Sequence, residues 1–247
     1  MGKIWDKIRG IRDRSRPFCS VIIPAAGASI RMGGGSKQFM DLCGAPVLMR
    51  TLCVVDRAER VDEIIVATRE DMLETVAEMC SRAGLQKPAR VILGGNSRLE
   101  SVLAGALEAD PRAELLAVHD GNRPLIRPEE FDEVVRQGAI TYAVAPAIPV
   151  SSTIKIVDEN MRIKSTPNRS ELYCAQTPQV FQADILKAAL QSAMDAGVSV
   201  TDDCSAVERL GKDVYLIPGD PENIKITVPL DMVIAEAILK RREREQT

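Results

Sequence analysis

The residues best suited to chemistry lie in one stretch, Ser20–Gln38, which reads SVIIPAAGASIRMGGGSKQ. An apolar run stops at Pro24, and a loop of alanines and glycines follows that carries Arg31 and Lys37. Small side chains let a ligand approach backbone N–H groups, which suit phosphate oxygens, and the two cations add positive charge. The stretch therefore predicts a cradle for a nucleoside triphosphate.

Two common phosphate-binding loops do not match this stretch. A Rossmann fingerprint needs G-x-G-x-x-G after the strand, but Gly27 is followed by Ala-Ser-Ile. A Walker loop needs Gly-Lys-Ser/Thr, whereas residues 36–38 read Ser-Lys-Gln. Spacing alone leaves one alternative open, a flexible glycine turn with two solvated cations.

Three further positions carry groups that suit chemistry. Asp120 follows an apolar run, and its carboxylate could hold Mg²⁺ or simply cap the next turn. The segment 94–101, GGNSRLES, could form a slot lined by backbone or an ordinary helix N-terminus. Lys225 alternates with two isoleucines, so on a strand it would point to the opposite face, where a lone lysine is usually just exposed.

Alternating strands and helices must position these groups. We predict strands at 21–24, 62–68, 90–93 and 115–119, and helices at 45–57, 71–83 and 98–109. This alternation is typical of a doubly wound, mostly parallel sheet, which binds ligands at the carboxyl ends of its strands. The first, third and fourth strands end in polar or glycine-rich loops, so we expect one crevice lined from several places.

The second half of the chain interrupts this pattern. Two alternating runs at 152–157 and 161–164 flank a polar turn and predict a β-hairpin, within an arm at about 147–170. The hairpin has little apolar surface of its own, so we expect it to project and pair with something. Further elements are a helix at 183–196, a helix capped by Thr201, a strand at 214–217 and a last helix from Pro229.

Composition limits the class of protein. The chain has 247 residues, of which 45% are hydrophobic and 3% aromatic, and a net charge of −3. We expect a single domain over 18–247 after a basic extension at 1–17, with no nucleic-acid or membrane partner. The six cysteines form no C-x-x-C pair, which is typical of reduced thiols in a cytoplasmic protein.

Several segments, taken in order, resemble the 2-C-methyl-D-erythritol 4-phosphate cytidylyltransferases, nucleotidyltransferases of the non-mevalonate isoprenoid pathway. They are PAAG at 24–27 with Arg31, KQF at 37–39, HDGNRP at 119–124, TIK at 153–155, TPNR at 166–169, QTPQ at 176–179, TDD at 201–203 and NIKIT at 223–227. The resemblance covers about 21–236. It implies an α/β fold of the nucleotide-diphospho-sugar transferase type, with a Rossmann-like doubly wound sheet and a projecting β-hairpin arm.

The resemblance also implies a role for each matching residue. The catalytic residues would be Arg31, Lys37 and Lys225, and Asp120 would bind Mg²⁺. The nucleotide would be bound by Ala25, Ala26, Gly27, Gly95, Asn96 and Ser101. The sugar phosphate would be bound by Arg123, Thr153, Arg169 and Thr177, with the arm reaching into the partner of a homodimer.

The implied reaction is transfer of the cytidylyl group from CTP to a sugar-alcohol phosphate. Two alternatives remain, a ribitol 5-phosphate cytidylyltransferase and a nucleotide-binding regulatory protein without turnover. The chain departs from the family pattern at Ser36, which replaces a proline, at Asn122, which replaces a small residue, and at Asn168, which replaces an aspartate. The last departure bears on the site, because that aspartate can orient Arg169.

Overall fold

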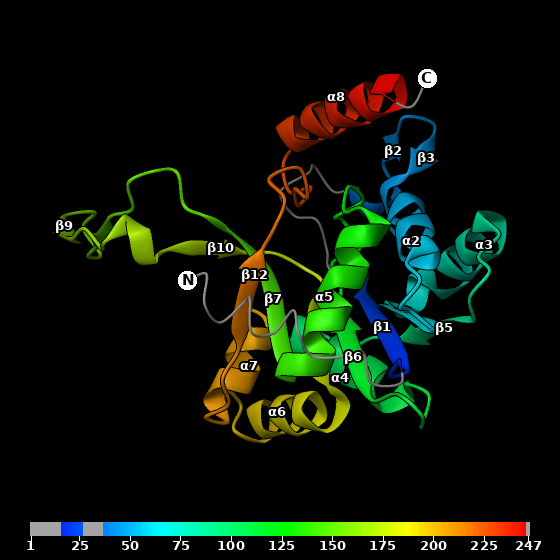
Figure 1. Ribbon diagram of the computed structural model, residues 1–247, viewed down its shortest axis with the longest axis horizontal. Coiled ribbons are helices and arrows are strands. Elements are labelled where there is room, and N and C mark those ends of the chain that lie inside the picture. Colours follow the sequence, from blue (N-terminus) through cyan, green and yellow to red (C-terminus); the bar gives the residue numbers. More distant parts are fainter. Residues whose placement is uncertain (1–15, 27–36, 246–247) are drawn as a thin grey trace.

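The chain folds around one eight-stranded sheet with the strand order β10-β7-β11-β6-β1-β4-β5, in which β12 also pairs with β7 (Figure 1). The computed structural model describes residues 16–26 and 37–245. The strands are β1 (Cys19–Pro24), β4 (Glu63–Thr68), β5 (Ala89–Leu93), β6 (Leu115–Val118), β7 (Ala143–Pro149), β10 (Tyr173–Ala175), β11 (Gln179–Gln182) and β12 (Tyr215–Pro218).

The direction of the strands decides which loops meet. β1 pairs in parallel with β4 and β6, β4 with β5, and β7 with β12, whereas β11 runs antiparallel to both β6 and β7. The predicted mostly parallel sheet is therefore confirmed. The carboxyl ends of β1, β5 and β6 lie at one edge, and the segment before β11 reaches the same edge because β11 runs the other way.

Helices cover both faces of the sheet. Along β1, Val21 and Ile23 pack on one face and Ile22 on the other, as the two-residue repeat of a strand requires. The first face is covered by α2 (Val47–Arg57), α3 (Leu73–Ala83) and α5 (Pro128–Thr141). The second is covered by α4 (Arg98–Glu108), α6 (Ala183–Asp195) and α7 (Asp203–Arg209). This is the three-layer arrangement expected of a doubly wound sheet.

Some predicted boundaries are wrong. Residues 45–46 form a short strand, β3 (Ala45–Pro46), which pairs with β2 (Asp41–Leu42), so the helix predicted from 45 begins at 47. The cap of α7 is Asp202 rather than Thr201, because the Asp202 carboxylate accepts a hydrogen bond from Ser205 N at 2.9 Å. Helix α5 is not among the elements that we predict.

The predicted hairpin is confirmed, with shorter strands than expected. β8 (Ile156–Val157) pairs with β9 (Ile163–Ser165), and Asp158 Oδ1 accepts hydrogen bonds from Asn160 N and Arg162 N in the turn between them. Figure 1 shows β9 in the arm that projects away from the helices and the main sheet, and β10 leads from the arm back to the edge of that sheet, where it pairs with β7. The arm thus presents its residues away from the body of the fold.

The last part of the chain packs beside the turn that follows β6. Helix α8 (Pro229–Glu245) packs through Met232 and Ala235 on a small cluster that also contains Leu125 and Ile226. The segment 223–227 is not a strand, which corrects the prediction for Lys225. Across the described ranges, no helix is both long and apolar enough to cross a membrane.

Candidate functional site

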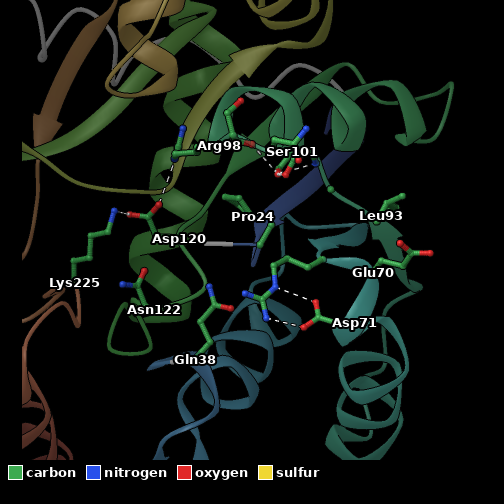
Figure 2. Close-up of a pocket in the computed structure, with 16 residues that line it drawn as sticks. Pro24, Gln38, Glu70, Asp71, Leu93, Arg98, Ser101, Asp120, Asn122 and Lys225 are labelled. Atoms are coloured by element: carbon green, nitrogen blue, oxygen red, sulfur yellow. Dashed lines mark hydrogen bonds and ion pairs between the residues drawn. The ribbon is translucent and has the colours of Figure 1, made fainter. Parts of the chain in front are cut away.

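A cavity of about 1040 Å³ opens where β1, β5 and β6 end (Figure 2). Its lining includes Ala26, Gly95, Asn96, Ser101, Asp120 and Lys225, all predicted site residues. In Figure 2, Asp120, Asn122 and Lys225 lie on one side and Glu70, Asp71 and Leu93 on the other. The single crevice predicted from the strand ends therefore exists, and six predicted residues meet in it.

One part of the cavity, which we call the slot, is lined by the small residues Ala26, Gly94, Gly95 and Ser101. A Cβ atom on Gly94 would lie 2.8 Å from Ser101 Oγ and 3.4 Å from Ala26 Cβ, so only glycine fits there. Ser101 Oγ accepts a hydrogen bond from Gly95 N at 3.1 Å and donates to Ser97 O at 2.9 Å. A slot of small side chains and backbone groups suits a flat, small ring and excludes a larger one by volume.

The same segment is also a capped helix N-terminus. Ser97 Oγ accepts from Glu100 N at 3.1 Å, and the Glu100 carboxylate accepts from Asn96 N at 2.8 Å. The capping and slot interpretations of the sequence are therefore compatible. The cap fixes the backbone that lines the slot.

Asp120 is the anionic centre of another part of the cavity. Its carboxylate lies 2.9 Å from Lys225 Nζ, 3.4 Å from Arg123 Nε and 3.7 Å from Arg98 Nη2. Burial alone would raise the pKa of Asp120, but the charges of Lys225, Arg98 and Arg123 together hold it well below its usual range. Asp120 is thus ionised and held among three cations.

Arg98 has a second carboxylate partner, Asp203, which belongs to the segment TDD at 201–203 and has no role assigned from the sequence. Its guanidinium lies 2.7 Å from Asp203, which is almost fully buried at the start of α7. Gln179 Oε1 accepts from Asp203 N at 3.1 Å and so fixes the position of that residue. Burial raises the pKa of Asp203, and the charge of Arg98 opposes this. Arg98 is consequently held between Asp203 and Asp120.

Asn122 holds the segment that carries Lys225. Its side-chain Nδ2 donates to Ile226 O at 2.6 Å, and its backbone oxygen accepts from Ile226 N at 2.9 Å. Ile226 is fully buried, so the neighbouring Lys225 points into the cavity. The orientation predicted for Lys225 is right, although two bonds to a loop replace the expected strand ladder.

Arg123 and Thr177 lie under Asp120 rather than in the lining of the cavity. Arg123 is 8% exposed and donates from Nη1 to Asn223 O at 2.6 Å. Thr177 is 4% exposed, and its Oγ1 accepts from Asp120 N at 3.0 Å. Their roles toward a sugar phosphate stay predictions. In this protomer they support Asp120.

Thr153 and Arg169 lie in the arm and do not line the cavity. Arg169 is exposed and donates from Nη1 to Ser151 O at 3.0 Å. Asn168 Oδ1 accepts from Ser170 N at 3.2 Å and caps the short helix η4 (Arg169–Glu171). Asn168 therefore caps η4, whereas the guanidinium of Arg169 is bonded to Ser151 O.

The remaining predicted residues are only partly open to description. Ala25 is buried, and its backbone N donates to Ala67 O at 2.7 Å. Gly27 and Arg31 fall outside the described residues. Lys37 begins the short helix η2 (Lys37–Phe39), but its side chain is also outside them. The cradle prediction for these three residues therefore stays a prediction.

A divalent cation beside Lys225 would find one carboxylate, Asp120, because Glu70 and Asp71 lie on the other side of the cavity (Figure 2). Among the described residues, no group of three or more histidine, cysteine or acidic side chains could hold a metal ion. Mg²⁺ commonly uses one or two carboxylates and takes its other ligands from phosphate and water. The ionised Asp120 fits a Mg²⁺ ion of that kind, and the described residues do not fit a metal held by protein ligands alone.

Comparison with known proteins agrees with this geometry. The family model described as IspD, 2-C-methyl-D-erythritol 4-phosphate cytidylyltransferase, matches residues 19–241. The chain belongs to this family. Two curated members are similar along more than nine-tenths of their length. The protein from Symbiobacterium thermophilum is 40% identical over 92% of this chain and 94% of its own, and that from Parasynechococcus marenigrum is 41% identical over 91% and 99%.

Solved structures of cytidylyltransferases share the fold. The crystal structure of 4-diphosphocytidyl-2C-methyl-D-erythritol synthase from Anaerococcus prevotii matches with a TM-score of 0.81 and 32% identity, over 92% of this chain and all of that one. The enzyme from Thermus thermophilus matches with a TM-score of 0.72 and 29% identity, over 90% and 99%. The predicted α/β fold and family are thus confirmed.

Proposed function

We propose that this cytidylyltransferase transfers the cytidylyl group of CTP to 2-C-methyl-D-erythritol 4-phosphate. A phosphate oxygen of the acceptor bonds to the α-phosphorus as the bond to the β-phosphate oxygen breaks, and pyrophosphate leaves with that electron pair. The observation that carries the proposal is one cavity with a small slot in one part and the Asp120–Lys225 pair in another, in a chain of this family.

The slot would take the cytosine ring. This part of the cavity is lined by Ala26, Gly95, Asn96 and Ser101, and the α4 cap fixes their backbone. Such a space admits a pyrimidine more readily than a purine. Ala25 is buried and does not line the cavity, so its predicted contact with the nucleotide stays a prediction from the sequence. From the sequence, Gly27, Arg31 and Lys37 would hold the triphosphate.

Catalysis then rests on positioning and charge. The attacking phosphate is already anionic, so no general base is needed. His119 is not in the cavity lining, and burial lowers its pKa to about 4. Lys225 would neutralise the α-phosphate as negative charge develops there. When bound, Mg²⁺ on Asp120 would supply charge neutralisation across the phosphates.

We also propose a cytoplasmic homodimer joined through the arm. Four apolar side chains of the arm are at least 40% exposed, namely Ile154, Ile156, Met161 and Ile163. A hairpin of this size is marginal alone, and a two-fold partner would cover these side chains. All six cysteines lie among the described residues and are free thiols, which supports a reducing compartment.

Pyrophosphate release tests the proposed reaction. We expect release with CTP and 2-C-methyl-D-erythritol 4-phosphate, and much less with ribitol 5-phosphate. Thermal shifts with Mg²⁺ should be larger for CTP than for UTP, ATP or NAD, since a ligand of the native state stabilises it. Faster release with ribitol 5-phosphate would favour the ribitol enzyme. A CTP shift without release from either acceptor would favour a regulatory protein.

Replacing Asn122 tests how Lys225 is held. Asn122→Ala removes the bond to Ile226 O and leaves the backbone bond in place. We expect kcat to fall roughly 3–10-fold, because a buried hydrogen bond contributes about 0.5–1.5 kcal/mol. The exposed amide of Gln191 on α6, which bonds only to Asp195 in the same helix, provides the control, and Gln191→Ala should leave kcat unchanged. An unchanged kcat in Asn122→Ala would show that the backbone bond alone positions Lys225.

A further inference from the structure

His119 is the only histidine of the chain, and it lies directly before Asp120. It is 0% exposed, and its ring meets the Phe131 ring edge-on, with centroids 5.4 Å apart and an interplanar angle of 68°. Because the ring does not reach the cavity, it has no direct part in the proposed chemistry. Its polar contacts nevertheless connect three residues of the site.

The contacts of His119 assign its tautomer. Nε2 lies 3.2 Å from Arg123 O, and a carbonyl oxygen only accepts, so Nε2 carries the hydrogen. A neutral imidazole has one N–H group, so Nδ1 is an acceptor. Nδ1 lies 3.0 Å from Thr177 Oγ1, and the Thr177 hydroxyl therefore donates to it.

The Thr177 hydroxyl has its second bond on the other side. Its oxygen accepts from Asp120 N at 3.0 Å. The hydrogen bonds thus run in one direction, from Asp120 N–H to the Thr177 hydroxyl to His119 Nδ1, and from His119 Nε2–H to Arg123 O. They tie both ends of the turn that follows β6 to the segment before β11.

We propose that His119 is a positioning residue that acts through Thr177 on Asp120 and, at its other nitrogen, on the turn that ends at Arg123. The neutral ring with hydrogen on Nε2 leaves the Thr177 oxygen free to accept from Asp120 N. That bond places the carboxylate where it meets Lys225 at 2.9 Å. The inference deepens the proposed function, on which its kinetic consequence rests.

A single histidine makes the tautomer directly measurable. We would label the untagged protein with ¹⁵N-histidine and record the two imidazole nitrogens by NMR at neutral pH. We expect hydrogen on Nε2 and an unprotonated Nδ1, and a shift of the Nδ1 resonance in Thr177→Val. Hydrogen on Nδ1, or a Thr177→Val spectrum identical to that of the wild type, would overturn the assignment.

Steady-state kinetics test whether the hydrogen bonds of His119 and Thr177 affect catalysis. His119→Phe keeps a ring and removes both hydrogen bonds of the imidazole. Thr177→Val keeps the shape of the side chain and removes both hydrogen bonds of the hydroxyl, the one from Asp120 N and the one to His119 Nδ1. We expect kcat to fall ~10–100-fold in each, as when an outer partner of a catalytic ligand is lost. The KM for CTP should change less, because the slot lies in another part of the cavity. Because both residues act through the same chain of hydrogen bonds, the double variant should lose little more kcat than either single variant.

A control variant separates the effect of packing around the His119 ring from the effect of its hydrogen bonds. Phe131→Leu alters the edge contact with His119 and removes no hydrogen bond. It should lower the melting temperature and leave kcat near that of the wild type. An equal loss of kcat in Phe131→Leu would assign the effect to packing and overturn the proposal. If the wild type releases no pyrophosphate, the proposed function fails, while the NMR result still decides the hydrogen-bond directions.

Discussion

Lys225→Ala is expected to lower kcat by ~10²–10³-fold and to leave the fold nearly intact. Its Nζ lies 2.9 Å from Asp120, and its side chain is 41% exposed within the cavity. A side chain this exposed contributes little packing to the fold. Arg98 and Arg123 remain near the Asp120 carboxylate after the change, so the negative charge is not left isolated.

The kinetic pattern identifies the step at which Lys225 acts. A charge that mainly stabilises the transition state lowers kcat with little change in KM. A raised KM with normal kcat would instead mean that Lys225 binds the ground state. Lys240→Ala is the matched control, because Lys240 pairs only at 3.4 Å with Glu236 on an exposed face of α8. Lys37→Ala should behave like Lys225→Ala if the cradle prediction for Lys37 is right.

The meeting of the strand ends could be predicted because it depends on local signals. Pro24, Gly94 and Asp120 each follow an apolar run, and parallel strands bring their carboxyl ends to one edge. A slot and a carboxylate then fall in the same crevice. The antiparallel strand β11 brings Thr177 to this edge. It has only four residues, which are too few for the sequence to indicate either the strand or its direction.

The network around Asp120 could not be predicted, because its bonds join distant parts of the chain. Asn122 holds a backbone group 104 positions away, and Gln179 fixes Asp203 across 24. The alternation around Lys225 predicts the right face, but it does not distinguish a strand from an extended loop held at one residue. The sequence predicts only that Arg98 lies in the first turn of a helix. Its two carboxylate partners come from other parts of the chain and are brought to it by folding.

Arg169 gives the second large effect that we expect. Arg169→Ala should lower kcat/KM for the sugar phosphate by roughly 10–100-fold, since a hydrogen bond to a charged group contributes about 1.5–3 kcal/mol. Yet Arg169 projects on the arm and does not line the cavity of its own protomer. We therefore expect it to act in the cavity of a partner subunit.

Mixing two impaired variants shows whether Arg169 acts in the cavity of its own subunit or in that of a partner subunit. In a dimer of Lys225→Ala with Arg169→Ala, a shared site gives one cavity with both lesions and one with neither. Random exchange of equal amounts should then restore about a quarter of the wild-type activity, because half of the dimers are mixed and each has one intact site. If Arg169 serves its own subunit, every cavity keeps one lesion and mixing restores nothing. Mass spectrometry of the intact dimers confirms exchange, and each variant incubated alone provides the baseline. No recovery after confirmed exchange, or a protein that is monomeric at assay concentration, would rule out the shared site.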